Sequence, residues 1–386
     1  VSLVAAACSS DGPPAPRPEV KAYAGPDVEG GRHPFGLKWD WAQIDTLSPY
    51  LSANTGGTTF FEFSWCDVES TQRVRDWSEV DRAVDSAQRL GYRINLKIRV
   101  GSCWATGDDE AAANQHRTAS SMPKDLLLYS HFVSEAVTRY AERGVGDFAL
   151  ENEVNARNFW RGSAHDYRRL VEVGARAAHQ AKPDVRVFDS GLSSVAWGAI
   201  VADALFKEGH RDDALAFYSR YFARRQEARG STYPNVTSEA ALRSVLDGEP
   251  GTRARDFFEE TVRLVRDGTV DAFQLHYYDP WRELPRLMRL LRDRLGASVT
   301  IEAWEAGVAW PGDRYDAEVH AQDTRKLLST MLDEGVRRVI YLPVSFSPGR
   351  GRATELVRPL VSYEDGTPNA AGDAYTSLVA AKRERS

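Results

Sequence analysis

The 386-residue sequence is poor in cysteine and methionine, with three of each, and no block of Lys and Arg is longer than two residues. The formal net charge is -6. An acidic chain without basic clusters argues against a nucleic-acid partner. Beyond the first few residues, no apolar run is long enough to span a bilayer.

Several catalytic signatures are also missing. The eight histidines form neither His-x-His nor His-Glu-x-x-His, which argues against a metal-dependent hydrolase. No Gly-x-Gly-x-x-Gly or phosphate-binding loop opens a helix, and no Gly-x-Ser-x-Gly is present. We therefore expect no cofactor and no metal.

The first residues pair a short apolar stretch with cysteine and then a Pro-rich segment. Val1–Ser10 resembles the end of a bacterial lipoprotein signal with Cys8 as the lipidated residue, and residues 9–18 are rich in proline. We expect residues 1–34 to be a signal remnant and tether, the protein to be exported to the cell envelope or beyond, and Cys8 to anchor it to a membrane. The alternative is an Ala-rich terminus with an incidental cysteine.

The remaining cysteines, Cys66 and Cys103, each follow one of two consecutive predicted strands. A disulfide between neighbouring loops and two separate buried thiols both fit this pattern.

Eight strand-like runs alternate with helical patterns, which predicts an α/β protein with a single (β/α)8 TIM barrel over residues 35–386. About 80 residues (191–270) separate the fifth and sixth strands, which is more than a single crossover helix needs. We expect this segment to form a helical excursion. The alternative is an extended surface loop. The eight runs are Phe35–Trp41, Thr58–Trp65, Arg93–Gly101, Asp147–Glu153, Val185–Ser190, Ala272–Tyr278, Val299–Glu305 and Arg338–Phe346.

Two of these strands end in carboxylates. Glu153 ends the fourth strand and Glu305 ends the seventh, and strand ends meet at the catalytic face of such a barrel. A carboxylic acid and a carboxylate facing one another are what hydrolysis of a glycosidic bond requires. We predict Glu153 as the general acid/base and Glu305 as the nucleophile. Glu302 is the other candidate for the nucleophile. It is an odd number of residues from Glu305 along the strand, so its side chain should face away from the barrel interior.

Neighbouring side chains suggest supporting roles. Asn152 is placed to bind a sugar hydroxyl next to the reacting carbon, and Tyr278 to donate a hydrogen bond to the nucleophile. His276 is expected to tune the site or bind substrate. Glu151 shares the parity of Glu153 but should lie deeper, with a structural hydrogen bond.

Eight of the ten tryptophans fall at or just after predicted strand ends. Indole faces stack on sugar rings, so this bias predicts an aromatic rim for carbohydrate at the barrel mouth, although capping of the core explains some of these residues. The predicted substrate-binding members are Trp39, Trp65, Trp104, Trp160, Trp281 and Trp310.

These residues lead to a family resemblance. Asn152-Glu-Val-Asn155, the following Asn158-Phe-Trp-Arg-Gly162, and the strand around Glu305 resemble clan A glycoside hydrolases, most closely the xylosidase-like family 39. The resemblance implies a retaining double displacement on a β-linked carbohydrate. The second strand lacks the clan's frequent arginine, and we expect Arg99 to replace it; Phe346 stands where the clan usually has tryptophan.

A different class remains as the alternative: a carbohydrate-binding lipoprotein on a glycosidase scaffold that no longer turns over. The presence of both Glu153 and Glu305 argues against it. The sequence leaves open the sugar, endo or exo cleavage, and the oligomeric state.

Overall fold

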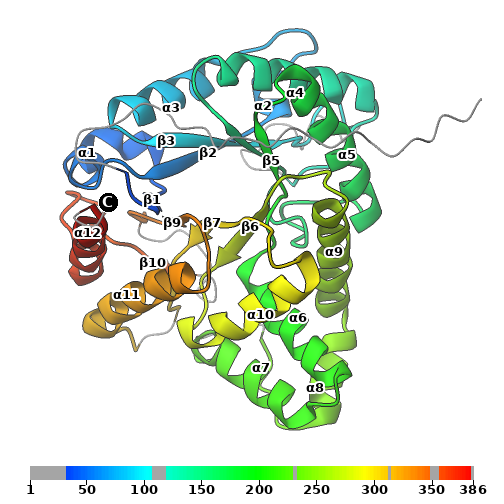
Figure 1. Cartoon of the computed structure of the whole chain (residues 1–386), viewed down its shortest axis with the longest axis vertical. Coiled ribbons are helices and arrows are strands. Elements are labelled where there is room, and N and C mark those ends of the chain that lie inside the picture. The colour runs from blue at the N-terminus through cyan, green and yellow to red at the C-terminus, as the bar shows by residue number, and fades with distance from the viewer. Residues whose placement is uncertain (1–31, 107–118, 229–232, 312–313, 348–355, 384–386) are drawn as a thin grey trace, which may run out of the picture.

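The computed structural model describes residues 32–106, 119–228, 233–311, 314–347 and 356–383 (Figure 1). The predicted signal segment, including Cys8, lies outside these residues. Among the described helices, none has the length and apolarity needed to cross a bilayer.

Eight parallel strands form the predicted barrel, in the order β5-β4-β3-β2-β1-β9-β7-β6. A parallel bridge between Phe188 and Ala272 joins its two ends, β5 and the residue before β6. The strands are β1 (Phe35–Leu37), β2 (Thr58–Ser64), β3 (Arg93–Arg99), β4 (Asp147–Leu150), β5 (Arg186–Phe188), β6 (Phe273–Tyr277), β7 (Ile301–Ala306) and β9 (Val339–Tyr341). A separate antiparallel pair, β8 (Val308–Ala309) and β10 (Val357–Arg358), follows the ends of β7 and β9.

Helices surround these strands on the outside (Figure 1). Several begin at side-chain caps, such as the Ser163–Asp166 capping box of α5. They are η1 (Trp41–Gln43), α1 (Ile44–Ala53), α2 (Trp65–Val68), α3 (Ser78–Arg89), α4 (Leu126–Ala141), α5 (Ala164–Ala181), α6 (Ser194–Lys207), α7 (Arg211–Gln226), α8 (Glu239–Asp247), α9 (Glu249–Arg266), η2 (Trp281–Glu283), α10 (Leu284–Leu295), α11 (Ala317–Asp333) and α12 (Ala370–Arg383).

The long connection between β5 and β6 is helical, as predicted. It forms α6 to α9, and the side chains of α6 are largely buried. The alternative of an extended surface loop is therefore wrong.

The barrel interior is built in layers, because alternate residues of each strand point inward. One inward layer is apolar and separates two charged groups of side chains. It consists of Phe60, Ala149, Phe188, Ala272, Trp304 and Ile340.

The amino-terminal end of the barrel is closed by buried ion pairs, which we call the floor cluster: Asp147, Arg186, Glu302 and Arg338. Arg186 donates to both oxygens of Asp147 at 2.7 Å and lies 3.2 Å from Glu302. Arg338 contacts Asp147 and lies 2.8 Å from Glu302. The charges compensate one another, so burial is tolerated.

Cys66, in α2, and Cys103, after β3, form a disulfide. It ties together the segments that leave two adjacent strands, β2 and β3. The structure thus chooses one of the two arrangements that the sequence allowed.

Candidate active site

Strand β4 ends in an unusual backbone turn. Glu151 and Glu153 both have positive φ, 69° and 42°, and flank Asn152. This left-handed region is unfavourable for residues with a side chain and is concentrated at functional sites. The predicted strand therefore stops at Leu150 rather than Glu153, and the turn, not strand alternation, presents Glu153 at the barrel mouth.

Strand β7 contains a bulge. Its register against β6 runs from Ala303 opposite Leu275 to Glu305 opposite His276, so Trp304 is an extra residue. Trp304 points into the apolar layer, and the bulge turns Glu305 inward as well. The parity argument for Glu302 is therefore wrong: it faces the interior, in the floor cluster, below the apolar layer.

The carboxylate of Glu305 has two strong donors. Lys97 Nζ lies 2.6 Å from Oε1, and the Tyr278 hydroxyl donates to Oε2 at 2.7 Å. Burial alone would raise the pKa of Glu305, but the neighbouring His276 and Lys97 and these hydrogen bonds hold it well below its usual range. Burial raises the pKa of Tyr278 well above its ordinary value, which keeps it a donor.

His276 lies between the two candidate catalytic carboxylates. Its Nδ1 is 3.0 Å from Oε1 of Glu153 and 3.6 Å from Oε2 of Glu305. Its Nε2 is 2.9 Å from Oε1 of Gln274 and 3.3 Å from Lys97 Nζ. The ring is fully buried and is held from both sides.

The helical excursion supports the end of β6 from outside. The indole of Trp197 donates to the carbonyl of His276 at 3.0 Å, and Ser194 Oγ accepts from the backbone N–H of Tyr278 at 2.8 Å. Asp279, next along the chain, accepts from Ser194 and pairs with the buried Arg225 of α7. The excursion therefore fixes the positions of His276 and Tyr278.

Among the described residues, one oxygen each of Glu153 and Glu305 and a ring nitrogen of His276 lie within 4.8 Å of one another. A carboxylate separation of about 5–5.5 Å is typical of retaining glycosidases, and a wider one of inverting enzymes. Both carboxylates keep part of their surface exposed, 14% and 10%. The buried ammonium group of Lys97 opposes a divalent cation here, so we assign no metal.

Arg99, expected to stand in for the arginine that the second strand lacks, is held by other side chains. It pairs with Glu62 at 3.2 Å and lies 3.7 Å from Glu151, over the ring of Phe159. Lys97, one inward position earlier on β3, is the cation that contacts Glu305.

Glu151 is fully buried and accepts from the N–H of Val100 at 2.6 Å, which is the structural hydrogen bond expected of it. Burial raises its pKa to about 7.

The tryptophans are deeper than predicted. Trp39, Trp65 and Trp160 are at most 2% exposed and pack in the hydrophobic core, which corrects the stacking role expected of these three. Trp310, 8% exposed, lies under the guanidinium of Arg224 at 4.2 Å.

Trp104 and Trp281 are half-buried and donate through Nε1 to Glu69 and Asp323. Phe346 is half-buried. Aromatic capping of the core thus accounts for most of the bias toward strand ends.

Sequence reasoning missed Lys97 and Gln274. Both lie at inward positions of strands, and the alternation Asn95-Leu-Lys97-Ile-Arg99 places polar residues on the interior face of β3. A lysine inside a strand flanked by Leu and Ile was the available signal.

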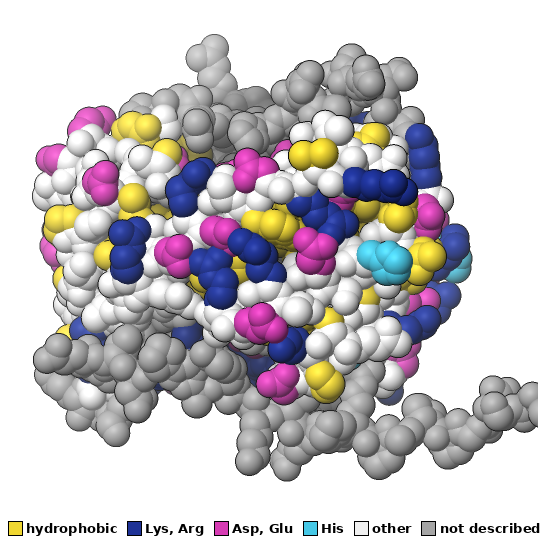
Figure 2. Space-filling view, turned by 90° about the horizontal axis from the view of Figure 1, so that it is seen from above, with side chains coloured by type: hydrophobic (Ala, Val, Ile, Leu, Met, Phe, Trp, Pro, Cys, Tyr) yellow, Lys and Arg dark blue, Asp and Glu magenta, His cyan; other side chains and the backbone are white. Residues whose placement is uncertain are grey.

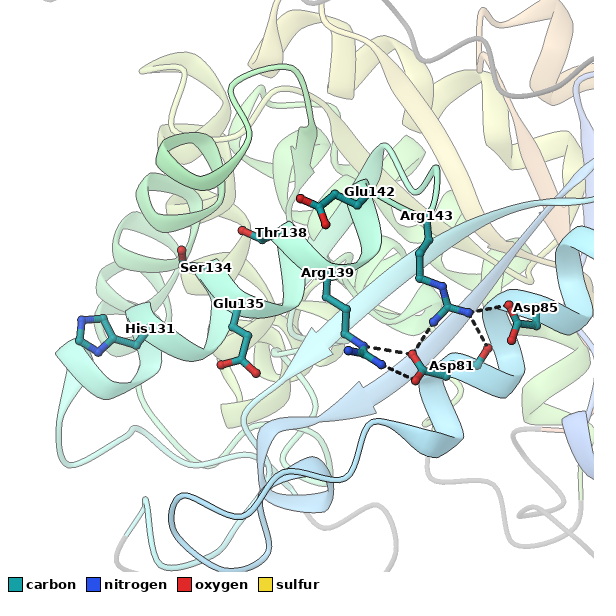
Figure 3. Close-up of a pocket in the computed structure, with 9 residues that line it drawn as sticks. All are labelled: Asp81, Asp85, His131, Ser134, Glu135, Thr138, Arg139, Glu142 and Arg143. Atoms are coloured by element: carbon teal, nitrogen blue, oxygen red, sulfur yellow. Dashed lines mark hydrogen bonds and ion pairs between the residues drawn. The ribbon is translucent and has the colours of Figure 1, made fainter.

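A separate hollow of about 870 Å³ lies on the outer surface between α3 and α4 (Figure 3). Arg139 and Arg143 both pair with Asp81 there, and Arg143 also with Asp85 at 2.5 Å. The face seen from above shows acidic and basic side chains intermixed (Figure 2). Because these charges are paired on helices outside the barrel, the hollow is not the catalytic site.

Comparisons with solved structures agree with this fold. A family 39 glycoside hydrolase from Bacteroides cellulosilyticus WH2 superposes with a TM-score of 0.54 at 12% identity, over 90% of this chain and 63% of that one. An exo-β-1,4-mannosidase from Opitutaceae bacterium strain TAV5 superposes with a TM-score of 0.56 at 15% identity, over 91% of this chain and 60% of the mannosidase. Xylanase 10B from Thermotoga maritima superposes with a TM-score of 0.56 at 13% identity, over 91% of this chain and 96% of the xylanase.

The structural neighbours therefore include glycoside hydrolases of families 39 and 10, and the chain shares the fold of clan A. It spans less than two thirds of the length of the first two proteins. No protein-family model matches the sequence, and no curated protein does. At these identities the likeness establishes the fold alone.

Proposed function

We propose that the protein is a retaining glycoside hydrolase that cleaves a β-linked glycoside or polysaccharide by double displacement. The observation that supports this most strongly is the pairing of two carboxylates within 4.8 Å, each in a different environment. Glu305 is held ionised by Lys97 and Tyr278, whereas Glu153 has the imidazole of His276 beside it at 3.0 Å. Two carboxyl groups whose surroundings differ in this way suit an acid and a nucleophile.

In this mechanism Glu305 attacks the anomeric carbon while Glu153 protonates the leaving oxygen. Glu153 then takes a proton from water, which displaces the sugar from Glu305 with overall retention. The amide of Asn152, whose Oδ1 accepts from Lys97 at 2.8 Å, keeps its N–H donors for a sugar hydroxyl.

The test is hydrolysis of a panel of aryl β-glycosides and β-linked polysaccharides, with product anomers followed by proton NMR. Wild type is compared with Glu153→Gln and Glu305→Gln. We expect both variants to lose several orders of magnitude in turnover. The loss for Glu153→Gln should be smallest with acidic leaving groups, since these need no protonation.

Retained anomeric configuration would support the double displacement, and inversion would overturn it. The control Glu302→Gln, altered at the floor cluster, tests whether loss of any interior carboxylate has the same effect. If no substrate is turned over but one changes tryptophan fluorescence, the sugar-binding protein becomes the better explanation.

We also propose export, with Cys8 as the lipidated residue. The disulfide between Cys66 and Cys103 supports an oxidising compartment. Incorporation of labelled palmitate into the full chain, and its loss in Cys8→Ala, tests this; unlabelled wild type would contradict it.

A further inference from the structure

Gln274 has a fixed orientation in the barrel interior. Its side-chain Nε2 donates to the backbone carbonyl of Asp189 at 2.6 Å, and its backbone N–H donates to the carboxylate of the same residue, also at 2.6 Å. A carbonyl only accepts, so the amide nitrogen must face Asp189 and the amide oxygen must face the other way, toward His276.

This orientation sets the tautomer of His276. Oε1 of Gln274 lies 2.9 Å from Nε2 of the ring and only accepts hydrogen bonds, so Nε2 must carry a proton. Lys97 Nζ also lies 3.3 Å from this nitrogen, but an ammonium group only donates and cannot replace the acceptor oxygen of Gln274. The three N–H donors of Lys97 already have Glu305, Asn152 and the ring of Phe60, whose centroid lies 4.3 Å from Nζ.

The other ring nitrogen, Nδ1, lies closer to the carboxylate of Glu153 than to that of Glu305. With its proton on Nε2, neutral His276 turns a bare Nδ1 toward Oε1 of Glu153 at 3.0 Å. Two lone pairs at that distance repel, so one further proton must lie between them, on Nδ1 or on the carboxyl group. In both forms the pair of His276 and Glu153 is neutral overall and shares one proton.

We propose that Gln274, fixed by Asp189, is a positioning residue that makes His276 and Glu153 share the proton needed by the leaving group. This rests on the proposed function of Glu153 as general acid. When the glycosidic bond breaks, the shared proton passes to the leaving oxygen, and a carboxylate and a neutral His276 remain. In the second step the attacking water returns one proton to the pair.

Other charged groups also face His276 and act on its protonation. Lys97 on β3 is 3.3 Å from Nε2, Glu305 on β7 is 3.6 Å from Nδ1, and Tyr278 reaches the site through Glu305. Asp189 after β5 acts through Gln274. Lys97 beside Nε2 and Glu305 beside Nδ1 both favour a proton on Nδ1, so a proton on Nε2 depends on the acceptor oxygen of Gln274.

The direct test is ¹⁵N NMR of the wild-type protein with labelled histidine, with His276 assigned by comparison with His276→Gln. We expect Nε2 of His276 to stay protonated across the pH range in which Nδ1 changes. A neutral ring protonated at Nδ1 would overturn the proposal. This measurement needs no substrate, so its failure is distinct from failure of the proposed function.

The kinetic test compares Gln274→Met with Gln274→Glu. Methionine removes the acceptor, so the alkaline limb of kcat/KM should move to lower pH by on the order of one unit. Glutamate keeps an acceptor and adds negative charge, so that limb should move to higher pH. Gln226→Met is the control, because the amide of Gln226 also donates to a backbone carbonyl but at the surface. Unshifted limbs in both folded variants would overturn the positioning role.

Discussion

The ammonium group of Lys97 and the carboxylate of Glu305 form a buried ion pair, with 2.6 Å between Nζ and Oε1. Lys97 is fully buried, and its partner Glu305 is the nucleophile that we propose. Because solvent does not reach the ammonium group of Lys97, this lysine is the counter-ion of the proposed nucleophile.

Lys97→Met should slow turnover by about 10²-fold, because a preorganised charge beside a reacting group has effects of that order. Lys97 lowers the pKa of Glu305, and the nucleophile must be ionised. Without Lys97 that pKa rises, so the acid limb of the pH–rate profile moves to higher pH. The exposed Lys124→Met is the control, and an unmoved limb in a folded Lys97→Met protein would contradict the assignment.

Gly191→Ala should impair the site through His276. Gly191 has a φ of 67°, and an added Cβ would lie 2.5 Å from Nε2 of His276. The matched control is Gly268→Ala, with a φ of 74° but open space around it. Both variants should lose about 1–2 kcal/mol of stability from backbone strain. Only Gly191→Ala should lower kcat, on the order of 10²-fold; equal kcat in the two variants would exclude the proposed clash.

Arg338→Met should destabilise the fold without directly changing the chemistry. It removes one of the cations that neutralise the buried carboxylates Asp147 and Glu302, and breaking such a pair costs about 3–5 kcal/mol. Arg337→Met is the control, since that neighbouring side chain is exposed. Urea unfolding measures the difference; kcat per folded molecule should stay near the wild-type value. A loss of stability no larger than that of Arg337→Met would mean that the floor cluster is dispensable.

Removal of the disulfide should lower the melting temperature. Replacing both Cys66 and Cys103 with serine should cost about 3–4 kcal/mol, since the bridge closes a loop of 37 residues. Reductant should lower the melting temperature of the wild type but leave the double variant unchanged. A Cys8→Ala background removes the third thiol from the comparison. Equal melting of reduced and oxidised wild type would count against the disulfide.

Most of the barrel could be predicted because its strands alternate with amphipathic helices, and each predicted strand overlaps one in the structure. The direction of side chains predicted from strand alternation was wrong where the backbone departs from regular strand geometry. The bulge at Trp304 and the left-handed residues Glu151 and Glu153 re-aim side chains in ways that a period of two cannot anticipate.

The supporting residues of the site were harder to find than the two carboxylates. Asp189, directly after β5, and Gln274, on β6, are 85 residues apart in sequence, and their hydrogen bonds exist only after the barrel closes. The buried positions of Trp39 and Trp65 were missed for a similar reason, because the aromatic residues that cover them lie on other elements.

The apolar layer inside the barrel lies between two sets of ionised groups, with Trp304 as its largest member. It keeps their contacts separate: Lys97 and Glu305 pair at the mouth, while Asp147, Arg186, Glu302 and Arg338 pair with one another at the closed end, where they support the fold. Evolution of a new substrate preference can therefore reassign charges around Glu153 and Glu305 while the electrostatic support at the opposite end stays intact.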